Sequence, residues 1–127
     1  MKKRVYFAEI GKQKLLLIRK KNIWILPGGR LENGESDSDC LFRRLEEEFS
    51  VSKQKIRIYT FYKSFTSRAP FSNTILEAKV YFGRLGSGFI KPNNEIKNIA
   101  FVKDFENYKI SKLTNKIIDS LKEDKYL

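Results

Sequence analysis

The sequence contains no histidine and a single cysteine, Cys40, in 127 residues. Without histidine the chain cannot build a Ser-His-Asp triad, a Cys-His pair or an imidazole zinc site, so reactions that depend on these groups are excluded. A lone cysteine cannot form an internal disulfide. The side chains left for chemistry are carboxylates, hydroxyls, lysines and arginines.

Long apolar runs are also missing, because no apolar stretch approaches the roughly 20 residues that a membrane-spanning helix needs. The first residues, MKKRVYFAEIGKQK, carry a glutamate and further lysines where a secretory signal peptide would be apolar. With 41% hydrophobic and 13% aromatic residues, the chain is too apolar to be disordered. We therefore expect a single globular domain over residues 1–127, cytoplasmic and without a membrane partner.

Acidic residues are scarce, since 15 Asp and Glu stand against 26 Lys and Arg, a formal net charge of +11. Residues 30–51 nevertheless hold seven acids and only three arginines, a local net charge of −4 that leaves +15 for the rest of the chain. The basic remainder suits an anionic partner such as a nucleotide or nucleic acid, and equally a lysine-rich solvated surface. The acidic segment favours a bound cation.

Hydrophobic periodicity predicts strands on both sides of the acidic segment and a helix within it. Strands are expected at Val5–Ile10, Leu15–Ile18, Ile23–Leu26, Ile56–Phe65, Ile75–Arg84 and Ile99–Val102, the first two joined by a tight turn at GKQK. Pro27 and the two glycines after it should end the third strand. Ser36, with Asp39 as capping-box acid, begins a helix over 36–49, and Ser111 begins a second. This order is typical of an α/β or α+β domain with helices on a mixed sheet.

The helix over 36–49 carries acids beside and opposite its apolar stripe. Four apolar side chains share an arc of about 100° that faces the core: Leu41, Phe42, Leu45 and Phe49. Glu48 falls at the margin of this arc, where an unpaired carboxylate is costly, whereas Glu47 lies on the outer side. Glu48 is therefore a better metal-ligand candidate than a freely solvated acid.

The loop before the helix supplies further groups for such a site. Gly28 and Gly29 permit close approach of the backbone. The chain that follows them can bring Glu35 alongside Glu47 and Glu48. Carboxylate oxygens suit Mg²⁺ or Mn²⁺, the usual partners of di- and triphosphates. Chemistry on such phosphates needs charge neutralisation, alignment and an activated water, and it needs no histidine.

A structural interpretation of the same helix is also available. Its i,i+4 ion pairs would be Arg43–Glu47 and Arg44–Glu48. Such pairs stabilise an exposed helix by a few tenths of a kcal/mol each. Considered alone, the helix favours the interpretation that its acids form ion pairs on a solvated surface. Only the spacing of residues across the whole segment favours a metal site instead.

The segment from Gly29 to Val51 resembles the Nudix box, G-x5-E-x7-R-E-U-x-E-E-x-G-U, in which U is an aliphatic residue. The matching positions are Gly29, Glu35, Arg43, Leu45, Glu47, Glu48 and Val51. Arg44 stands where the family has glutamate, and Ser50 stands where it has glycine. The preceding residues, WILPGG, are similar to the segment that usually leads into the box. The strand order and the C-terminal helix are similar to bacterial members, including ADP-ribose pyrophosphatases.

The resemblance implies an α/β/α sandwich, with a mixed sheet and helices on both faces. It also implies hydrolysis of a nucleoside diphosphate linked to another group, which releases a nucleoside monophosphate. Glu47 and Glu48 would bind Mg²⁺ or Mn²⁺ and take part in catalysis, and Glu35 with Arg43 would form a supporting salt bridge. An acid from a later loop often joins the metal site in this family, and Glu95 is our candidate, with a solvated loop acid as the alternative.

Substrate contacts are assigned to four residues around the glycine turn: Trp24, Gly28, Gly29 and Arg30. Further candidates are Lys20, Lys21 and Lys91 for phosphates and Phe65 and Phe71 for base stacking, with strand packing or ordinary surface as the alternative for each. Similarity to bacterial members favours ADP-ribose or another nucleotide sugar, followed by a nucleoside triphosphate. Nucleic acid is a less favoured partner, and a monomer or homodimer is expected.

Arg44 raises an alternative function. In many members the glutamate at this position binds metal or activates the water, whereas here a guanidinium falls between Glu47 and Glu48. A cation ~4 Å from a metal ion, at an effective dielectric of ~20, costs several kcal/mol. We therefore expect fewer metal ions and slow turnover, and the alternative is a catalytically weak Nudix-fold domain that binds nucleotides or regulates. Ser50 carries a cost only if its backbone is left-handed.

Overall fold

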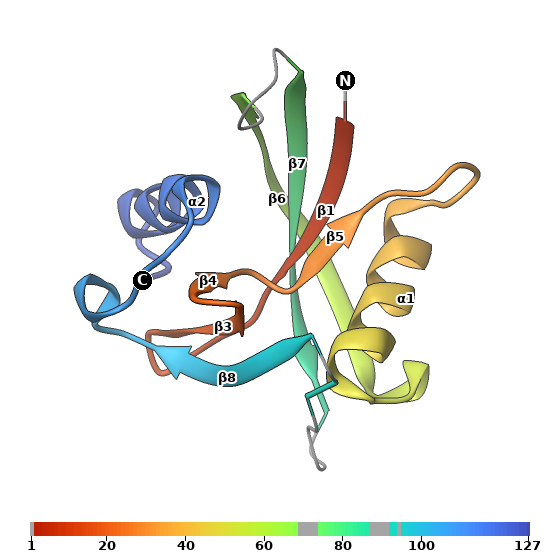
Figure 1. Cartoon of the computed structure of the whole chain (residues 1–127), viewed down its shortest axis with the longest axis horizontal. Coiled ribbons are helices and arrows are strands. Elements are labelled where there is room, and N and C mark those ends of the chain that lie inside the picture. Colours follow the sequence, from red (N-terminus) through yellow and green to blue (C-terminus); the bar gives the residue numbers. More distant parts are fainter. Residues whose placement is uncertain (1, 69–73, 87–91, 94) are drawn as a thin grey trace.

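The strands form two four-stranded sheets that lie between two helices (Figure 1). The computed structural model describes residues 2–68, 74–86, 92–93 and 95–127, so the candidates Phe71 and Lys91 lie outside the described residues. The elements are β1 (Lys2–Ala8), β2 (Ile10–Gly11), β3 (Lys14–Lys20), β4 (Ile23–Ile25), β5 (Gly28–Arg30), α1 (Asp37–Phe49), β6 (Ile56–Arg68), β7 (Ile75–Leu85), β8 (Ile96–Val102) and α2 (Lys112–Glu123). Two 3-10 turns, Lys53–Lys55 and Phe105–Asn107, were not predicted.

The first sheet has the order β5-β1-β7-β6 and is mixed, because β1 and β7 are parallel while the other neighbours are antiparallel. In the second sheet β3 pairs antiparallel with β2, β4 and β8. The expectation of one strand over Val5–Ile10 that turns back onto Leu15–Ile18 was wrong. Lys12 and Gln13 both have positive φ, 53° and 61°, as a two-residue hairpin turn requires, and this turn joins only the short β2 to β3. The earlier residues of the stretch, in β1, enter the other sheet.

The run of four apolar residues in β3 joins two cores. Leu16 and Ile18 belong to the cluster under α1, whereas Leu15 and Leu17 belong to the cluster under α2, and all four are fully buried. Successive side chains of a strand point to opposite faces, so a continuous apolar run means burial on both. The predicted sandwich with helices on both faces is therefore confirmed, with the sheet divided in two.

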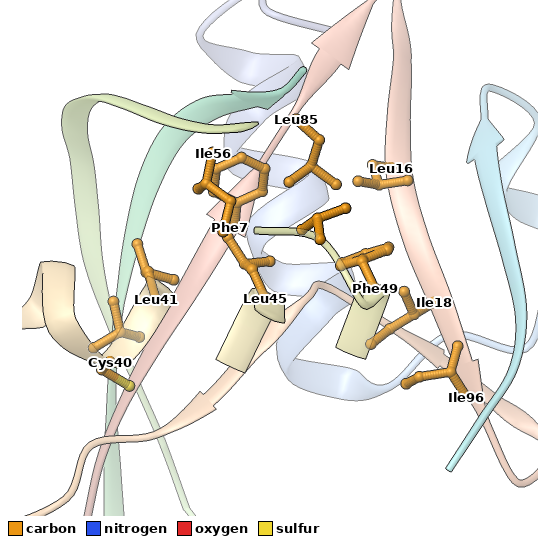
Figure 2. Close-up of a cluster of buried hydrophobic side chains, with 12 residues drawn as sticks. Phe7, Leu16, Ile18, Cys40, Leu41, Leu45, Phe49, Ile56, Leu85 and Ile96 are labelled. Carbon is orange, nitrogen blue, oxygen red and sulfur yellow. The ribbon is translucent and has the colours of Figure 1, made fainter. Parts of the chain in front are cut away.

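Helix α1 begins and ends as its sequence indicates. The Ser36 hydroxyl accepts a hydrogen bond from the Asp39 N–H at 3.1 Å, and the Asp39 carboxylate accepts one from the Ser36 N–H at 3.4 Å, which completes the predicted capping box. Three apolar residues of its inner face, Leu41, Leu45 and Phe49, pack against Phe7, Leu16 and Ile18 (Figure 2). Ser50 ends the helix with left-handed backbone angles, φ 55° and ψ 35°. Because this conformation costs a non-glycine residue roughly 1–2 kcal/mol, the serine carries the penalty that a glycine would avoid.

The paired glycines do not only end a strand, as predicted, but form one themselves. Gly28 and Gly29 lie in β5, opposite Tyr6 and Val5 of β1. A Cβ atom on Gly28, which has φ +128°, would lie 2.2 Å from the Val5 carbonyl oxygen. One on Gly29 would lie 2.6 Å from Nε of Arg44. The glycines thus let β5 fit between β1 and helix α1.

Helix α2 packs on the second core from the opposite side. Ser111 caps it, since its hydroxyl accepts a hydrogen bond from the Thr114 N–H at 3.2 Å, as predicted. Ile117, Ile118 and Leu121 form its buried face. Neither of the two helices in the described part of the chain has the length and apolar character that a membrane crossing requires.

Candidate functional site

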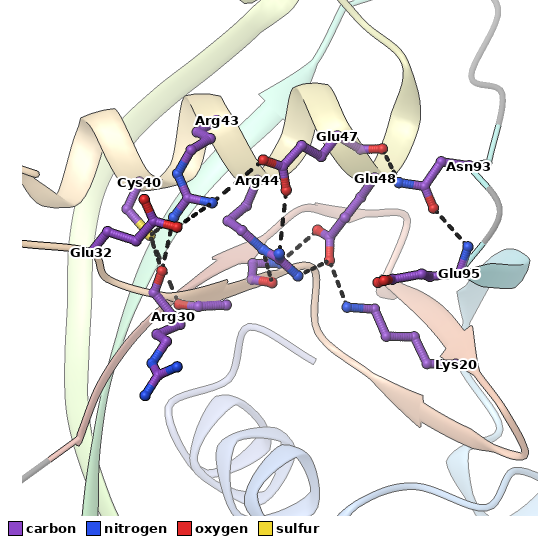
Figure 3. A network of polar contacts seen from close by, with 12 residues as sticks. Lys20, Arg30, Glu32, Cys40, Arg43, Arg44, Glu47, Glu48, Asn93 and Glu95 are labelled. Carbon is purple, nitrogen blue, oxygen red and sulfur yellow. Dashed lines mark hydrogen bonds and ion pairs between the residues drawn. The ribbon is translucent and has the colours of Figure 1, made fainter.

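Glu47 and Glu48 lie on the last turns of α1, where the helix faces β5 and the end of β3 (Figure 3). The side chain of Glu48 is 2% exposed, and its Oε1 accepts a hydrogen bond of 2.9 Å from the Gly28 N–H. The side chain of Glu47 is 48% exposed. Glu48 was predicted to lie at the margin of the core, and in the structure its side chain is buried. Strand β5, the glycine strand, brings the Gly28 N–H into contact with it.

Two cations neutralise the buried Glu48. Its Oε2 lies 3.2 Å from Nζ of Lys20 and 3.4 Å from Nη2 of Arg44. Burial raises the pKa of the Glu48 carboxyl, while Lys20, the Gly28 N–H and Arg44 act in the opposite direction. A buried carboxylate is stable only with such partners. Lys20, considered above as a phosphate contact, is thus a partner of Glu48.

The Arg44 guanidinium is held by three oxygen atoms. Its Nε donates to the Gly28 carbonyl at 3.2 Å, its Nη1 to Glu47 at 3.3 Å and its Nη2 to Glu48 at 3.4 Å. The predicted position of Arg44 between the two glutamates is confirmed. These oxygens are hard donors of the kind Mg²⁺ and Mn²⁺ prefer, but they already converge on a cation. Over the described residues, no cluster of three or more His, Cys, Asp or Glu is arranged to hold a metal ion.

Glu35 and Arg43 join the loop to the helix. Nε of Arg43 lies 2.7 Å from Oε2 of Glu35, and its Nη2 donates to Oε1 of Glu35 at 3.0 Å and to the Arg30 carbonyl at 3.0 Å. The hydrogen bond from Arg43 lowers the pKa of Glu35 to about 2. Arg43 also lies 3.5 Å from Glu47. The predicted salt bridge is therefore present, and it ties the loop after β5 to α1.

Glu95 lies across a small cavity from Glu47. The cavity has a volume of about 320 Å³ and is lined by Arg44, Glu47, Asn93 and Glu95. Asn93 links the two acids, because its amide donates to the Glu47 carbonyl and its side-chain oxygen accepts a hydrogen bond of 3.0 Å from the Glu95 N–H. Sequence reasoning placed Glu95 near the site but missed Asn93, whose only signal was its position in the same loop.

Two aromatic candidates, Trp24 and Phe65, pack in or against the core under α2. Trp24 packs edge-on against Tyr108, with ring centroids 5.2 Å apart, next to the core under α2. Phe65 is 7% exposed and belongs to the same core. Its burial leaves no open ring face for a base. Lys21 is exposed and follows β3.

Cys40 lies under the loop on the first turns of α1. Its Sγ is 3.3 Å from the Arg30 carbonyl oxygen, and the side chain is buried. Burial raises the pKa of the thiol to about 11. The thiol is therefore un-ionised at neutral pH. Cys40 contributes to the packing between α1 and the loop that supports the site.

Comparison with known proteins identifies the class. The family model for the NUDIX domain matches residues 5–118, and the chain belongs to this family. An RNA pyrophosphohydrolase of Ruthia magnifica subsp. Calyptogena magnifica is 45% identical over 61 residues, which cover 42% of this chain and 34% of that protein. The matched part thus spans about a third of that relative.

Solved structures show the same fold. The MutT protein from Methanosarcina mazei Go1 superposes with a TM-score of 0.80 at 16% identity, over 96% of this chain and 93% of that chain. A UDP-X diphosphatase gives a TM-score of 0.77 at 19% identity, over 96% of this chain and 63% of that chain. At such low identities the likeness concerns the fold alone.

Proposed function

We propose that this protein is a Nudix pyrophosphohydrolase, which cleaves the phosphoric anhydride of a nucleoside diphosphate linked to another group and releases a nucleoside monophosphate. The observation that carries the proposal is the buried Glu48, held at the Gly28 N–H of the glycine strand beside Glu47. A buried carboxyl whose pKa burial raises, with specific charged partners and a second acid beside it, is typical of functional sites. The NUDIX family match supports the same reaction class.

Glu47 and Glu48 would hold Mg²⁺ or Mn²⁺, with Glu95 on the far wall of the cavity as a further acid. The bound ion supplies charge neutralisation for the phosphates and a more acidic water. Arg44 would compete with the ion for the same oxygens, and it already lines the cavity. There its guanidinium can donate charge-assisted hydrogen bonds to phosphate oxygens. Gly28 and Gly29, without side chains, leave the backbone open to the same group.

Two substrate classes fit this proposal. A nucleotide sugar such as ADP-ribose is the first candidate, favoured by the similarity of the sequence to bacterial members of the family. RNA that carries a 5′ pyrophosphate linkage is the second, favoured by the partial relative named RNA pyrophosphohydrolase. The basic charge of +15 outside the acidic segment suits the longer polyanion.

The test is a hydrolysis screen with Mg²⁺ or Mn²⁺ against nucleotide sugars, dinucleotides, triphosphates and 5′-triphosphorylated RNA. Glu47→Gln and Glu48→Gln should each lower turnover of the best substrate by several orders of magnitude, because the amide keeps the shape and removes the ligating charge. Glu47→Gln should leave the Tm near the native value, whereas Glu48→Gln should lower it by leaving Lys20 and Arg44 short of an anion.

Glu106→Gln, an exposed acid of the 3-10 turn before α2, is the matched control and should keep native turnover and Tm. Near-native turnover in both Glu47→Gln and Glu48→Gln would show that the reaction, if any, occurs elsewhere.

A further inference from the structure

Two arginines face each other across β1 and β5. The register places Arg4 directly opposite Arg30. Residues so paired share one face, with Cβ atoms roughly 4.5–5.5 Å apart, and like charges there repel each other. Within the described residues neither guanidinium forms an ion pair. Nε of Arg4 is buried and has no hydrogen-bond partner.

The pair lies on the face of the first sheet opposite α1. Val5 and Phe7 pack under α1, so the alternating residues Arg4 and Tyr6 point the other way. Figure 3 shows the Arg30 side chain directed away from α1 as well. The residues that continue the row of Arg4 across β7 and β6 are Ala78 and Phe65. The neighbouring rows on this face contain Lys2, Leu76, Ser67, Tyr6, Val80 and Lys63. The acids nearby come from outside these strands, since Glu32 and Glu35 line one hollow with Arg30, and Asp124 pairs with Lys63.

This face is continuous with the candidate active site. Tyr6 lies in the row beside Arg4 and is paired with Gly28, whose carbonyl and N–H contact Arg44 and Glu48. Burial raises the pKa of the Tyr6 hydroxyl, and the charges of Arg4, Glu48 and Arg44 also act on it. From Gly28 to Arg30 the strand advances two residues, roughly 7 Å. A phosphate at the arginine pair would therefore lie within reach of a second phosphate at the glycine strand.

We propose that Arg4 and Arg30 together bind one phosphate group of the substrate on this face. An oxyanion between the two guanidinium groups replaces their repulsion with two attractions, through the terminal nitrogens that both side chains carry. Planar guanidinium groups match phosphate oxygens in a bidentate geometry. Arg30 was predicted to contact substrate, whereas Arg4 carried no signal in the sequence. The inference deepens the proposed function and rests on it for the identity of the substrate.

Calorimetric titration at low salt with EDTA tests the site without turnover. The probes are inorganic pyrophosphate, α,β-methylene-ADP and α,β-methylene-ATP. Arg4→Gln and Arg30→Gln should each weaken binding tenfold or more. Losses equal for the two nucleotides identify one of the first two phosphates as the ligand, and a loss confined to the ATP analogue identifies the third.

Arg57→Gln is the matched control, because Arg57 also faces an arginine, Arg84, across antiparallel strands. It should leave the affinity for all three probes within twofold of native. Without ligand, Arg4→Gln and Arg30→Gln should raise the Tm by relieving repulsion, and the rise in Tm that the probe gives the native protein should shrink in both.

Unchanged affinity in Arg4→Gln and Arg30→Gln would overturn the proposal, and so would a lower Tm without ligand in both, which marks arginines that only support the fold. Because binding is measured without metal or hydrolysis, these outcomes are separate from a failure of the hydrolysis screen. If the native protein hydrolyses none of the screened substrates but both variants lose anion affinity, the phosphate site is supported and the proposed reaction is not.

Discussion

At the scale of single residues, two cations from different parts of the chain oppose the rise that burial causes in the pKa of Glu48. Arg44 lies four residues before Glu48 on the same helix, and its contact was predictable from i,i+4 spacing. Lys20 comes from the end of β3, and its contact depends on how the second sheet meets α1. Sequence reasoning found the local partner and missed the distant one because no pattern in the sequence encodes that meeting.

Replacing Arg44 with glutamate reverses the charge at the centre of the site. Arg44→Glu places three acids at i, i+3 and i+4, so its Tm in EDTA should fall below the native value. Mg²⁺ or Mn²⁺ should then bind more tightly than to the native protein, raise the Tm and increase kcat on the substrate from the screen. Calorimetric metal titration beside thermal unfolding checks both effects.

The Arg44→Gln variant loses the cation without gaining an acid. Its metal affinity should therefore lie between that of the native protein and that of Arg44→Glu. Metal affinity equal to or weaker than native in Arg44→Glu would show that the arginine already leaves the site free, and that the catalytic base comes from elsewhere, with Glu95 and Glu46 the first to examine.

At the scale of elements, the loop between β5 and α1 is held by Glu35 and Arg43. The sequence predicted this brace through the spacing of the Nudix box, and both helix caps through Ser36 and Ser111. Helix caps and the spacing of the Nudix box depend on residues that are close together in the sequence, so the sequence pattern alone predicts them. The partition of strands into two sheets is not local, since it depends on whether β1 pairs with β3 or with β7, more than 60 residues away. The strand character of the glycines was missed for the same reason.

The brace predicts a particular dependence of stability on pH. Glu35 has a pKa of about 2 in the folded protein and an ordinary value of 4.5. A carboxyl whose pKa is lowered by folding contributes stability above its unfolded pKa and loses it as the pH falls toward the folded value. The native protein should therefore have a higher Tm than Glu35→Gln at pH 7, and the difference should shrink between about pH 4.5 and pH 2.

Thermal unfolding of both proteins from pH 2 to pH 7 measures this difference directly. A Tm difference that stays constant over the range would mean that Glu35 acts through its shape and not through its charge. Asp39→Asn, in the capping box on the first turn of α1, controls for general acid effects on the helix.

At the scale of the whole molecule, β3 couples the two cores because its neighbouring residues face opposite sides. Leu45 lies in the core under α1, and Trp24, the sole tryptophan of the chain, packs beside the other. Leu45→Ala should destabilise the protein by about 2–5 kcal/mol, as cavity-forming substitutions do. The loss should appear equally in Trp24 fluorescence and in far-UV circular dichroism during urea unfolding, as for one cooperative unit.

Ile75→Ala, at an exposed side chain of β7, should leave the free energy of unfolding within ~0.5 kcal/mol of native. Separate midpoints for fluorescence and circular dichroism in Leu45→Ala would show that the two cores unfold independently, despite the strand they share.

The buried Cys40 has a further consequence for this molecule. Only a thiolate attacks oxidants and alkylating reagents at a useful rate, and here the thiol is both un-ionised and covered by the loop that the brace holds down. The chain's single cysteine is therefore protected from oxidative damage for as long as α1 stays in place. Each time the helix lifts away from the loop, the protection ends. The rate at which Cys40 is modified thus measures how often α1 separates from the loop in the native protein.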